Sequence, residues 1–187
     1  MPMEPDNKDW TWVLSRPCPE CHFESTRYER SEISAMIRAN SAQWRKVLAQ
    51  QNAHIRSRDD LWSVLEYGCH VRDVYTVYQT RVVRMLTEDG PHYANWDQNV
   101  TARDDGYAQQ NPTQVAAELD AAADAIATTF EGLHNENQWQ RTGFRGDGSD
   151  FTVESISRYM IHDTIHHLVD IGLSPIEAGA TARIANS

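Results

Sequence analysis

The stretch that decides the fold is residues 61–85, LWSVLEYGCHVRDVYTVYQTRVVRM. Apolar residues recur along it at alternating steps of three and four, which places them on one face of an α-helix. They are Leu61, Val64, Gly68, Val71, Tyr75, Tyr78, Val82 and Met85. Asp59 or Asp60 can cap its start, and Gly90 and Pro91 end it. The pattern therefore predicts a long amphipathic helix.

Three further segments show the same helical period. The first in the chain covers about residues 26–51. The third helix begins with Asn111 as N-cap and Pro112 as first residue, and continues to Leu133. The fourth starts near Asp150 or Thr152, after a turn at 143–148, and ends at Gly172. Apolar residues occupy much of its circumference, so we expect it to be largely buried.

Together these segments predict an all-α protein, a single four-helix-bundle domain over residues 1–187. We expect an up-down-up-down order, with a long aromatic loop between the second and third helices. No strand pattern competes with the helices. Residues 1–25, which contain a Cys-x-x-Cys string, are expected to form an N-terminal extension.

The charge excludes some classes of partner. The chain has 27 acidic and 17 basic residues, a formal net charge of -10, so it should be repelled by nucleic acid and by anionic membranes. No segment is apolar enough to span a membrane, and the first residues resemble no export signal. We therefore expect a cytoplasmic protein whose three cysteines are reduced.

A pair of histidines in the fourth helix predicts a metal site. His162 and His166 are four residues apart, so their imidazoles lie on one helical face. His70 in the second helix is the expected third ligand. In an up-down-up-down bundle these two helices point the same way, and all three histidines then lie at similar depth, roughly 15 to 21 Å along the axis. His167 is turned by about 100° from His166 and is expected either to pack or to lie just behind the metal ligands.

Three neutral histidines with an open coordination position are typical of a catalytic or labile metal site. A structural zinc would normally have a fourth protein ligand. The plainer interpretation is that each histidine is an ordinary core residue with its own hydrogen-bond partner.

These residues resemble the DinB-like superfamily. The resemblance rests on three motifs: Glu66, Tyr67, His70 and Asp73; Asn95, Trp96 and Asp97; and His162, Asp163, His166 and His167. This superfamily of four-helix metalloenzymes includes thiol-dependent S-transferases and is related to the metal-binding domain of mycothiol-dependent maleylpyruvate isomerase. The resemblance implies that His70, His162 and His166 bind a divalent metal, zinc first and nickel second. The isomerase relatives have Glu in place of one histidine, whereas this chain keeps three, so the resemblance is closer to the transferase and uncharacterised branches than to the isomerase.

The resemblance implies a metal-dependent enzyme that activates a low-molecular-weight thiol, such as mycothiol or bacillithiol, for S-transfer to an electrophile or for isomerisation in detoxification. Tyr67, Asp97, Arg158 and Asp163 are candidates for orienting the ligands or binding a polar substrate. Each also has a plain structural interpretation. Two alternatives remain: a hydrolase that uses zinc-bound water, and a non-enzymatic metal- or haem-binding protein. A homodimer through helix faces is compatible with the sequence.

The string Cys18-Pro19-Glu20-Cys21-His22 has the spacing of a c-type haem attachment signature. We reject that interpretation because covalent haem attachment of this type belongs to exported proteins, and the first residues of this chain resemble no export signal. The string can instead be half of a zinc site completed by His22, Cys69 or another subunit, a redox dithiol, or a reduced turn stiffened by proline. Similar Cys-Pro-x-Cys segments at the start of some DinB-like proteins usually carry Gly where this chain has His22.

Overall fold

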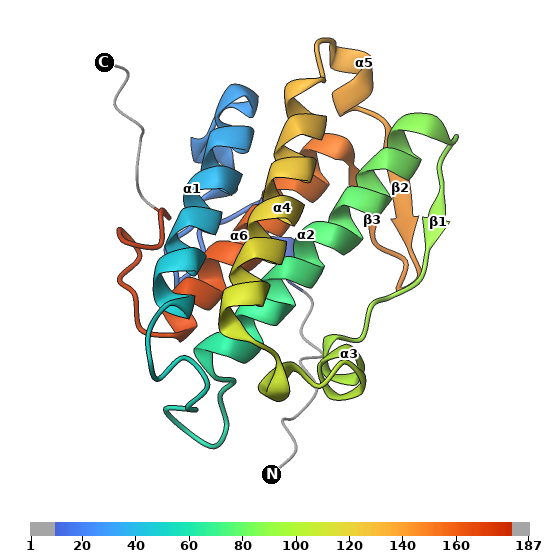
Figure 1. Cartoon of the computed structure of the whole chain (residues 1–187). Helices are drawn as coiled ribbons and strands as arrows, with labels where there is room; N and C mark the ends of the chain where they lie inside the picture. Colours follow the sequence, from blue (N-terminus) through green and yellow to red (C-terminus); the bar gives the residue numbers. More distant parts are fainter. Residues whose placement is uncertain (1–9, 181–187) are drawn as a thin grey trace.

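The computed structural model describes residues 10–180, and four long helices form a bundle in it (Figure 1). They are α1 Ile33–Leu48, α2 Val64–Thr87, α4 Pro112–Glu131 and α6 Val153–Asp170. The shorter elements are α3 Gln98–Asp104, α5 Glu136–Trp139, β1 His92–Tyr93, β2 Thr142–Arg145 and β3 Asp150–Thr152. The predicted four-helix bundle is confirmed, and so is the long connection between its second and third helices.

The helix ends agree with the sequence where a capping side chain is present. The side chain of Asn111 accepts hydrogen bonds at the start of α4, and that of Thr152 does so at the start of α6. The second helix begins later than predicted, because Ser63 rather than Asp59 or Asp60 caps it. The first helix is shorter than predicted, since residues 25–32 form two 3₁₀ turns before α1 begins.

The helix directions differ from the predicted up-down-up-down order. Arg72 of α2 pairs with Glu118 of α4, and further along both helices Gln79 bonds to Thr129, so α2 and α4 run parallel. Ring contacts from α2 to α6 have the opposite sense, because residue numbers rise in α2 as they fall in α6: Tyr67 meets His167, and Tyr78 meets Tyr159. Helices α2 and α6 are therefore antiparallel, as the colours of Figure 1 also show.

The connection between α2 and α4 explains this arrangement. Helix α2 has 24 residues and is about 36 Å long. Residues 88–111 are numerous enough to return along that length, and they carry β1 and α3 on the way. Helix α4 therefore starts at the same end of the bundle as α2, a direction that helical periodicity cannot reveal.

A small sheet, which was not expected, closes one end of the bundle. Strand β2 pairs in parallel with β1 and antiparallel with β3, in the order β1-β2-β3. Gly143 in β2 packs closely against α2, since a Cβ at this position would lie 2.7 Å from Met85 Cγ and 2.9 Å from a ring atom of Tyr93. The glycine-rich segment predicted as a turn before α6 is thus mostly a hairpin.

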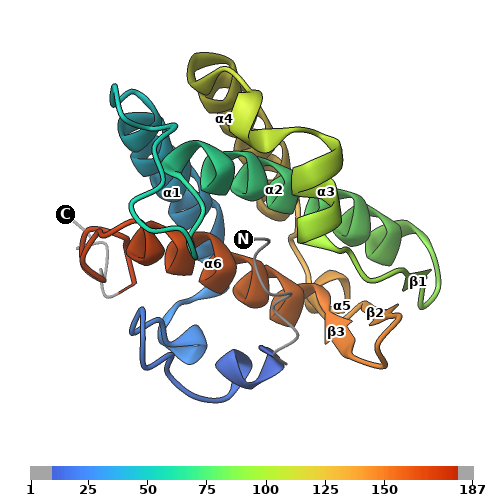
Figure 2. The same cartoon turned by 90° about the horizontal axis from the view of Figure 1, so that it is seen from below.

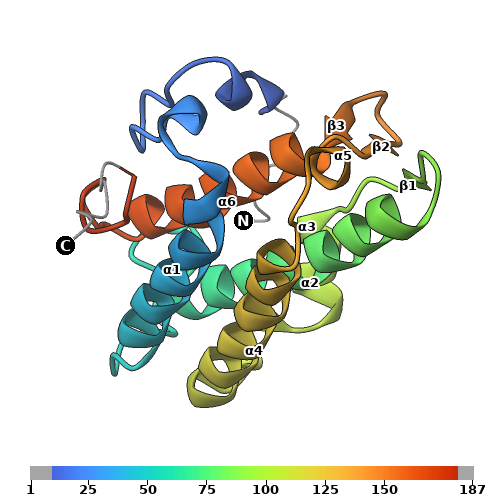
Figure 3. The same cartoon turned by 90° about the horizontal axis from the view of Figure 1, so that it is seen from above.

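The N-terminal segment packs against α6 rather than extending from the bundle. Views along the bundle from both ends show residues 10–32, drawn in blue, beside α6 on the side away from α4 (Figures 2 and 3). Cys18, Cys21 and Phe23 are buried there. Helix α6 is consequently covered by α1, α2 and this segment. No helix in the described residues has the length and apolar character that a membrane crossing requires.

A buried polar contact fixes three of the helices to one another. Asn40 of α1 accepts a hydrogen bond of 2.8 Å from the Tyr75 hydroxyl of α2. Its amide nitrogen donates 3.1 Å to the Thr164 carbonyl of α6. Because both side chains are almost fully buried, these bonds favour one alignment of the helices over others.

Replacing Glu66 by Gln should destabilise the start of α2 by about 2 kcal/mol, because Glu66 accepts charge-assisted bonds from Arg56 and from the Ser63 backbone. Burial raises the pKa of Glu66, but Arg56 and Ser63 outweigh burial and hold it below its ordinary 4.5. The stabilisation is thus present above that pH and disappears as the pH falls through the folded-state pKa.

The measurement is urea unfolding of both proteins between pH 3 and 7. Glu88→Gln is the control, since Glu88 forms a similar pair with Arg84 on the exposed surface and should show no measurable change. A Glu66→Gln deficit that is independent of pH would contradict this account.

Candidate functional site

A cavity of about 750 Å³ lies between α2, α6, the connection 88–111 and the N-terminal segment. Three tryptophans, Trp10, Trp62 and Trp96, line it together with histidines and carboxylates of α2 and α6. Its size is in the range of small-molecule sites, and its mixture of aromatic and polar walls is typical of them.

One group of possible metal ligands faces this cavity: His70 of α2 with Asp163 and His167 of α6. Each offers one ligand atom, and these atoms lie within 4.8 Å of one another. His70 Nε2 is 3.5 Å from one Asp163 oxygen, and His167 Nε2 is 3.4 Å from the other. Asp163 and His167 are four residues apart, so they lie on one face of α6 opposite the first turns of α2.

Three of the four ring nitrogens in this group have no hydrogen-bond partner, and the fourth, His167 Nδ1, bonds to Asp170. Both ring nitrogens of His70 and Nε2 of His167 are buried without one, because the contacts to Asp163 lack hydrogen-bond geometry. Buried polar atoms are normally satisfied, so orphaned atoms around one point suit a missing cation. The residues present therefore fit a divalent metal.

The electrostatics of the group also favour a cation. Burial lowers the pKa of His70, so this imidazole is neutral and available as a ligand. Burial opposes the charge of His167, but Asp163 and Asp170 outweigh it and raise its pKa to about 10. Burial likewise opposes the charge of Asp163, yet His167 and His70 hold its pKa well below the ordinary 3.8. Two carboxylates thus stabilise positive charge here, from a proton or a metal.

Asp170 orients His167. Its Oδ2 lies 2.8 Å from His167 Nδ1. When Nδ1 donates to that carboxylate and a metal ion displaces the proton from Nε2, the Nε2 lone pair faces Asp163 and His70. A carboxylate behind a histidine ligand is the usual arrangement at protein metal sites, because it fixes the ring and increases its basicity.

Aromatic rings hold His70 in place. Trp96 stacks on it with ring centroids 5.2 Å apart and planes inclined by 7°. Trp62 contacts another side of the ring at 5.5 Å. Trp96 comes from the connection 88–111, the long aromatic loop that the sequence predicted between the second and third helices.

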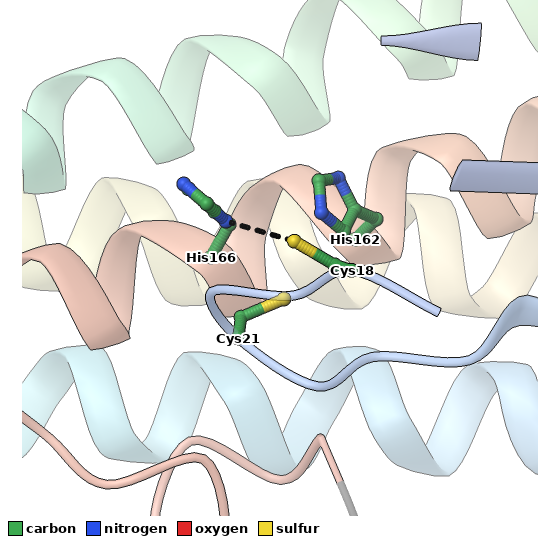
Figure 4. Close-up of side chains that lie close together, drawn as sticks. All are labelled: Cys18, Cys21, His162 and His166. Carbon is green, nitrogen blue, oxygen red and sulfur yellow. Dashed lines mark hydrogen bonds between the residues drawn. The ribbon is translucent and has the colours of Figure 1, made fainter. Parts of the chain in front are cut away.

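A second group of possible ligands lies on the neighbouring face of α6 and consists of Cys18, Cys21, His162 and His166 (Figure 4). All four side chains are buried. The three predicted ligand histidines are thus divided, since His70 belongs to the first group and His162 and His166 to the second. The three histidines were expected at similar depth because α2 and α6 were expected to run parallel. In the observed antiparallel arrangement, His70 lies level with His167.

The other predicted site residues take different positions. Asp163 belongs to the first group, and the ring of Tyr67 packs 4.9 Å from that of His167. Asp97 borders the cavity, and its carboxylate caps α3 by accepting from the backbone of Asn99 and Val100. Arg158 is not among the cavity-lining residues in the described chain; it donates to the backbone carbonyls of Ser25 and Tyr28.

Sequence reasoning missed His167 as a ligand and Asp170 as a site residue, because His167 was expected to pack or to lie just behind the metal ligands. A signal existed, since Asp163 and His167 have the same four-residue spacing as His162 and His166. Half of a zinc site was one of three interpretations of Cys18 and Cys21, and His162 and His166 were not among the partners considered for it.

Comparison with known proteins agrees with this architecture. The sequence profile of the DinB superfamily matches residues 36–171. Among solved structures, the chain is similar to YfiT from Bacillus subtilis, described as a probable metal-dependent hydrolase with an unusual four-helix bundle topology. The TM-score is 0.68 at 17% identity, covering 78% of this chain and 86% of that one, which is a likeness of fold. No curated protein matches this chain in sequence.

Arg158→Ala should loosen the N-terminal segment, because the carbonyls of Ser25 and Tyr28 lose their charged donor. Each lost hydrogen bond lowers the free energy of opening the segment by about 1 kcal/mol. The segment should therefore open more often, and trypsin should cleave after the exposed Arg27 at least about tenfold faster. The measurement is the initial cleavage rate at that bond in the folded protein. Arg84→Ala, which removes an exposed arginine of α2, should leave the rate unchanged, and equal rates for both variants would contradict the anchoring role.

Proposed function

Because the chain belongs to the DinB superfamily, we propose that it is a metal-dependent enzyme whose catalytic ion is bound by His70, Asp163 and His167. One observation carries the proposal: three ligand-type side chains meet at the wall of a large cavity, and both histidines among them have buried nitrogens without a hydrogen-bond partner. Three protein ligands leave coordination positions open to that cavity, as catalytic sites do.

We further propose that the co-substrate is a low-molecular-weight thiol such as mycothiol or bacillithiol, and that zinc or nickel is the ion. A bound divalent ion supplies Lewis acidity, which lowers the pKa of a coordinated thiol or water. In the transfer, the thiol sulfur forms a bond to an electrophilic carbon, the leaving group departs with its electron pair, and the thiol proton goes to solvent. The resemblance to a superfamily that includes thiol-dependent S-transferases and the size of the cavity support this reaction.

The protein's own residues bind and orient the substrates. Asp170 and Trp96 hold the rings of His167 and His70, and Trp62 and Tyr67 keep water from their far sides. The wall away from this group contains the guanidinium groups of Arg81 and Arg145. Arg145 is paired with Asp147, and Arg81 donates to the Ala94 carbonyl, so both are held in fixed positions for binding an anionic group.

A second candidate function is hydrolysis, in which water takes the place of the thiol. It is favoured by the description of YfiT as a probable metal-dependent hydrolase, and the same three residues would hold the ion. The two reactions are distinguished by their need for a thiol.

Removing a ligand of the first group tests the metal site. His70→Ala and His167→Ala should each bind one divalent ion fewer per chain, and turnover should fall by more than about 100-fold, because even residues that only orient ligands contribute about 10- to 100-fold. Elemental analysis of untagged protein measures the first effect. His134→Ala removes an exposed histidine and is the control. Unchanged metal content in His70→Ala and His167→Ala would refute the assignment.

The reaction is tested on the zinc- and nickel-loaded protein. We expect conjugation of a thiol to chlorodinitrobenzene, abolished by a chelator and restored by the metal. Hydrolysis of nitrophenyl esters without any thiol would instead establish the second candidate. Thiol conjugation that persists in His70→Ala would contradict the proposed mechanism.

A further inference from the structure

The second ligand group has the composition of a closed metal site. The ligand atoms of Cys18, Cys21, His162 and His166 lie within 4.8 Å of one another, and Figure 4 shows the four side chains converging between the N-terminal segment and α6. A tetrahedral zinc with sulfur and nitrogen ligands requires separations of about 3.3–3.8 Å between them. The distance from Cys18 Sγ to His166 Nδ1 is already 3.7 Å.

The histidines have nitrogens available for an ion. His166 directs Nδ1 at Cys18, while its Nε2 lies 3.4 Å from a Glu20 oxygen and 3.6 Å from an Asp170 oxygen. Carboxylates beside Nε2 favour the tautomer in which Nδ1 carries the free lone pair. His162 Nε2 is buried without any hydrogen-bond partner. This orphaned atom is independent evidence for a missing ligand, since a core histidine would normally be satisfied.

The backbone of the N-terminal segment is shaped to present both sulfurs together. The His22 N–H donates to the Cys18 carbonyl at 2.9 Å, and the Cys18 N–H donates to the Phe23 carbonyl at 2.8 Å, which closes a tight loop around the pair. His22 has a φ of 61°, a left-handed conformation that favours glycine. This explains why glycine would suit the position and indicates that the loop geometry is maintained despite its cost.

We infer that Cys18, Cys21, His162 and His166 bind a structural zinc ion that fastens the N-terminal segment to α6. Two thiolates and two imidazoles complete a tetrahedron, so no position is left for a substrate. The site shares no residue with the group of His70, Asp163 and His167. The two cysteines also lie outside residues 36–171, the part of the chain that matches the DinB superfamily.

A redox dithiol explains the cluster less well. Cys18 and Cys21 are 1% and 0% exposed, so an oxidant or partner thiol cannot reach them in the folded protein.

The ion would shape one wall of the cavity. Trp10 precedes the two cysteines in the chain, Glu20 lies between them, and both Trp10 and Glu20 line the cavity. The Trp10 ring lies 5.7 Å from the His162 ring and 5.2 Å from the His166 ring. The segment that carries these residues has only short 3₁₀ turns among its regular structure, so a zinc bound to both sides would hold it in place.

The test uses the full chain loaded with zinc and, separately, with cobalt as a spectroscopic probe. Cys18→Ser and Cys21→Ser should each lose one zinc per chain, and the cobalt form should lose its near-ultraviolet thiolate-to-metal absorption. Cys69→Ser is the matched control, since Cys69 is equally buried but bonds to Gln110, away from the cluster. It should retain both the zinc and the absorption.

The outcomes separate this site from the proposed catalytic one. His70→Ala should keep the cobalt–thiolate absorption, because it removes a ligand of the other group. If the protein binds a single zinc that is lost in Cys18→Ser but not in His70→Ala, the structural site stands and the catalytic assignment fails. Absence of the absorption in the cobalt-loaded wild-type protein would overturn the inference, whether or not the variants fold.

Discussion

The packing of α6 against neighbours on several sides is the constraint on which the rest of the structure depends. Its rings and carboxylates cannot all face solvent, because α1, α2 and the N-terminal segment each cover part of the helix. Residues one position apart differ in direction by about 100°, so His166 and His167 face different neighbours. The first meets a cysteine of the N-terminal segment, and the second meets His70 of α2. One helix therefore supplies possible metal ligands to two separate groups.

The sequence predicts the helices well because burial leaves a periodic record. Residues with the three-four spacing of α2, such as Tyr75 and Val82, are buried, and Asn111 and Thr152 cap their helices as expected. The direction of a helix relative to its neighbours cannot be predicted in this way, since the apolar face has the same spacing whichever way the chain runs. The parallel arrangement of α2 and α4 depends on the connection 88–111, whose path is set by contacts with β2 and with side chains such as Arg81.

The candidate site was predictable in its residue types but not in their grouping. Spacing identified His162 and His166 as neighbours on one face, and His70, the predicted third ligand, lines the same cavity as both of them. The sequence could not predict which segment packs against each face of α6. The N-terminal segment packs through 3₁₀ turns and a tight loop, which have no periodic pattern of apolar residues. An extension that looked separable from the bundle instead supplies Cys18 and Cys21 to its core.

Asp170 stands between the two ligand groups, with one oxygen 2.8 Å from His167 Nδ1 and the other 3.6 Å from His166 Nε2. A single negative charge thus supports one imidazole of each group. If cations occupied both groups, they would share the stabilising charge of Asp170 and would also repel each other through the protein interior. The affinity of each group for its ion would then depend on whether the other group is occupied. By thermodynamic reciprocity, each ion would change the affinity of the other by the same factor. Asp170 would therefore couple the ion that holds the N-terminal segment in place to the ion at the proposed catalytic site.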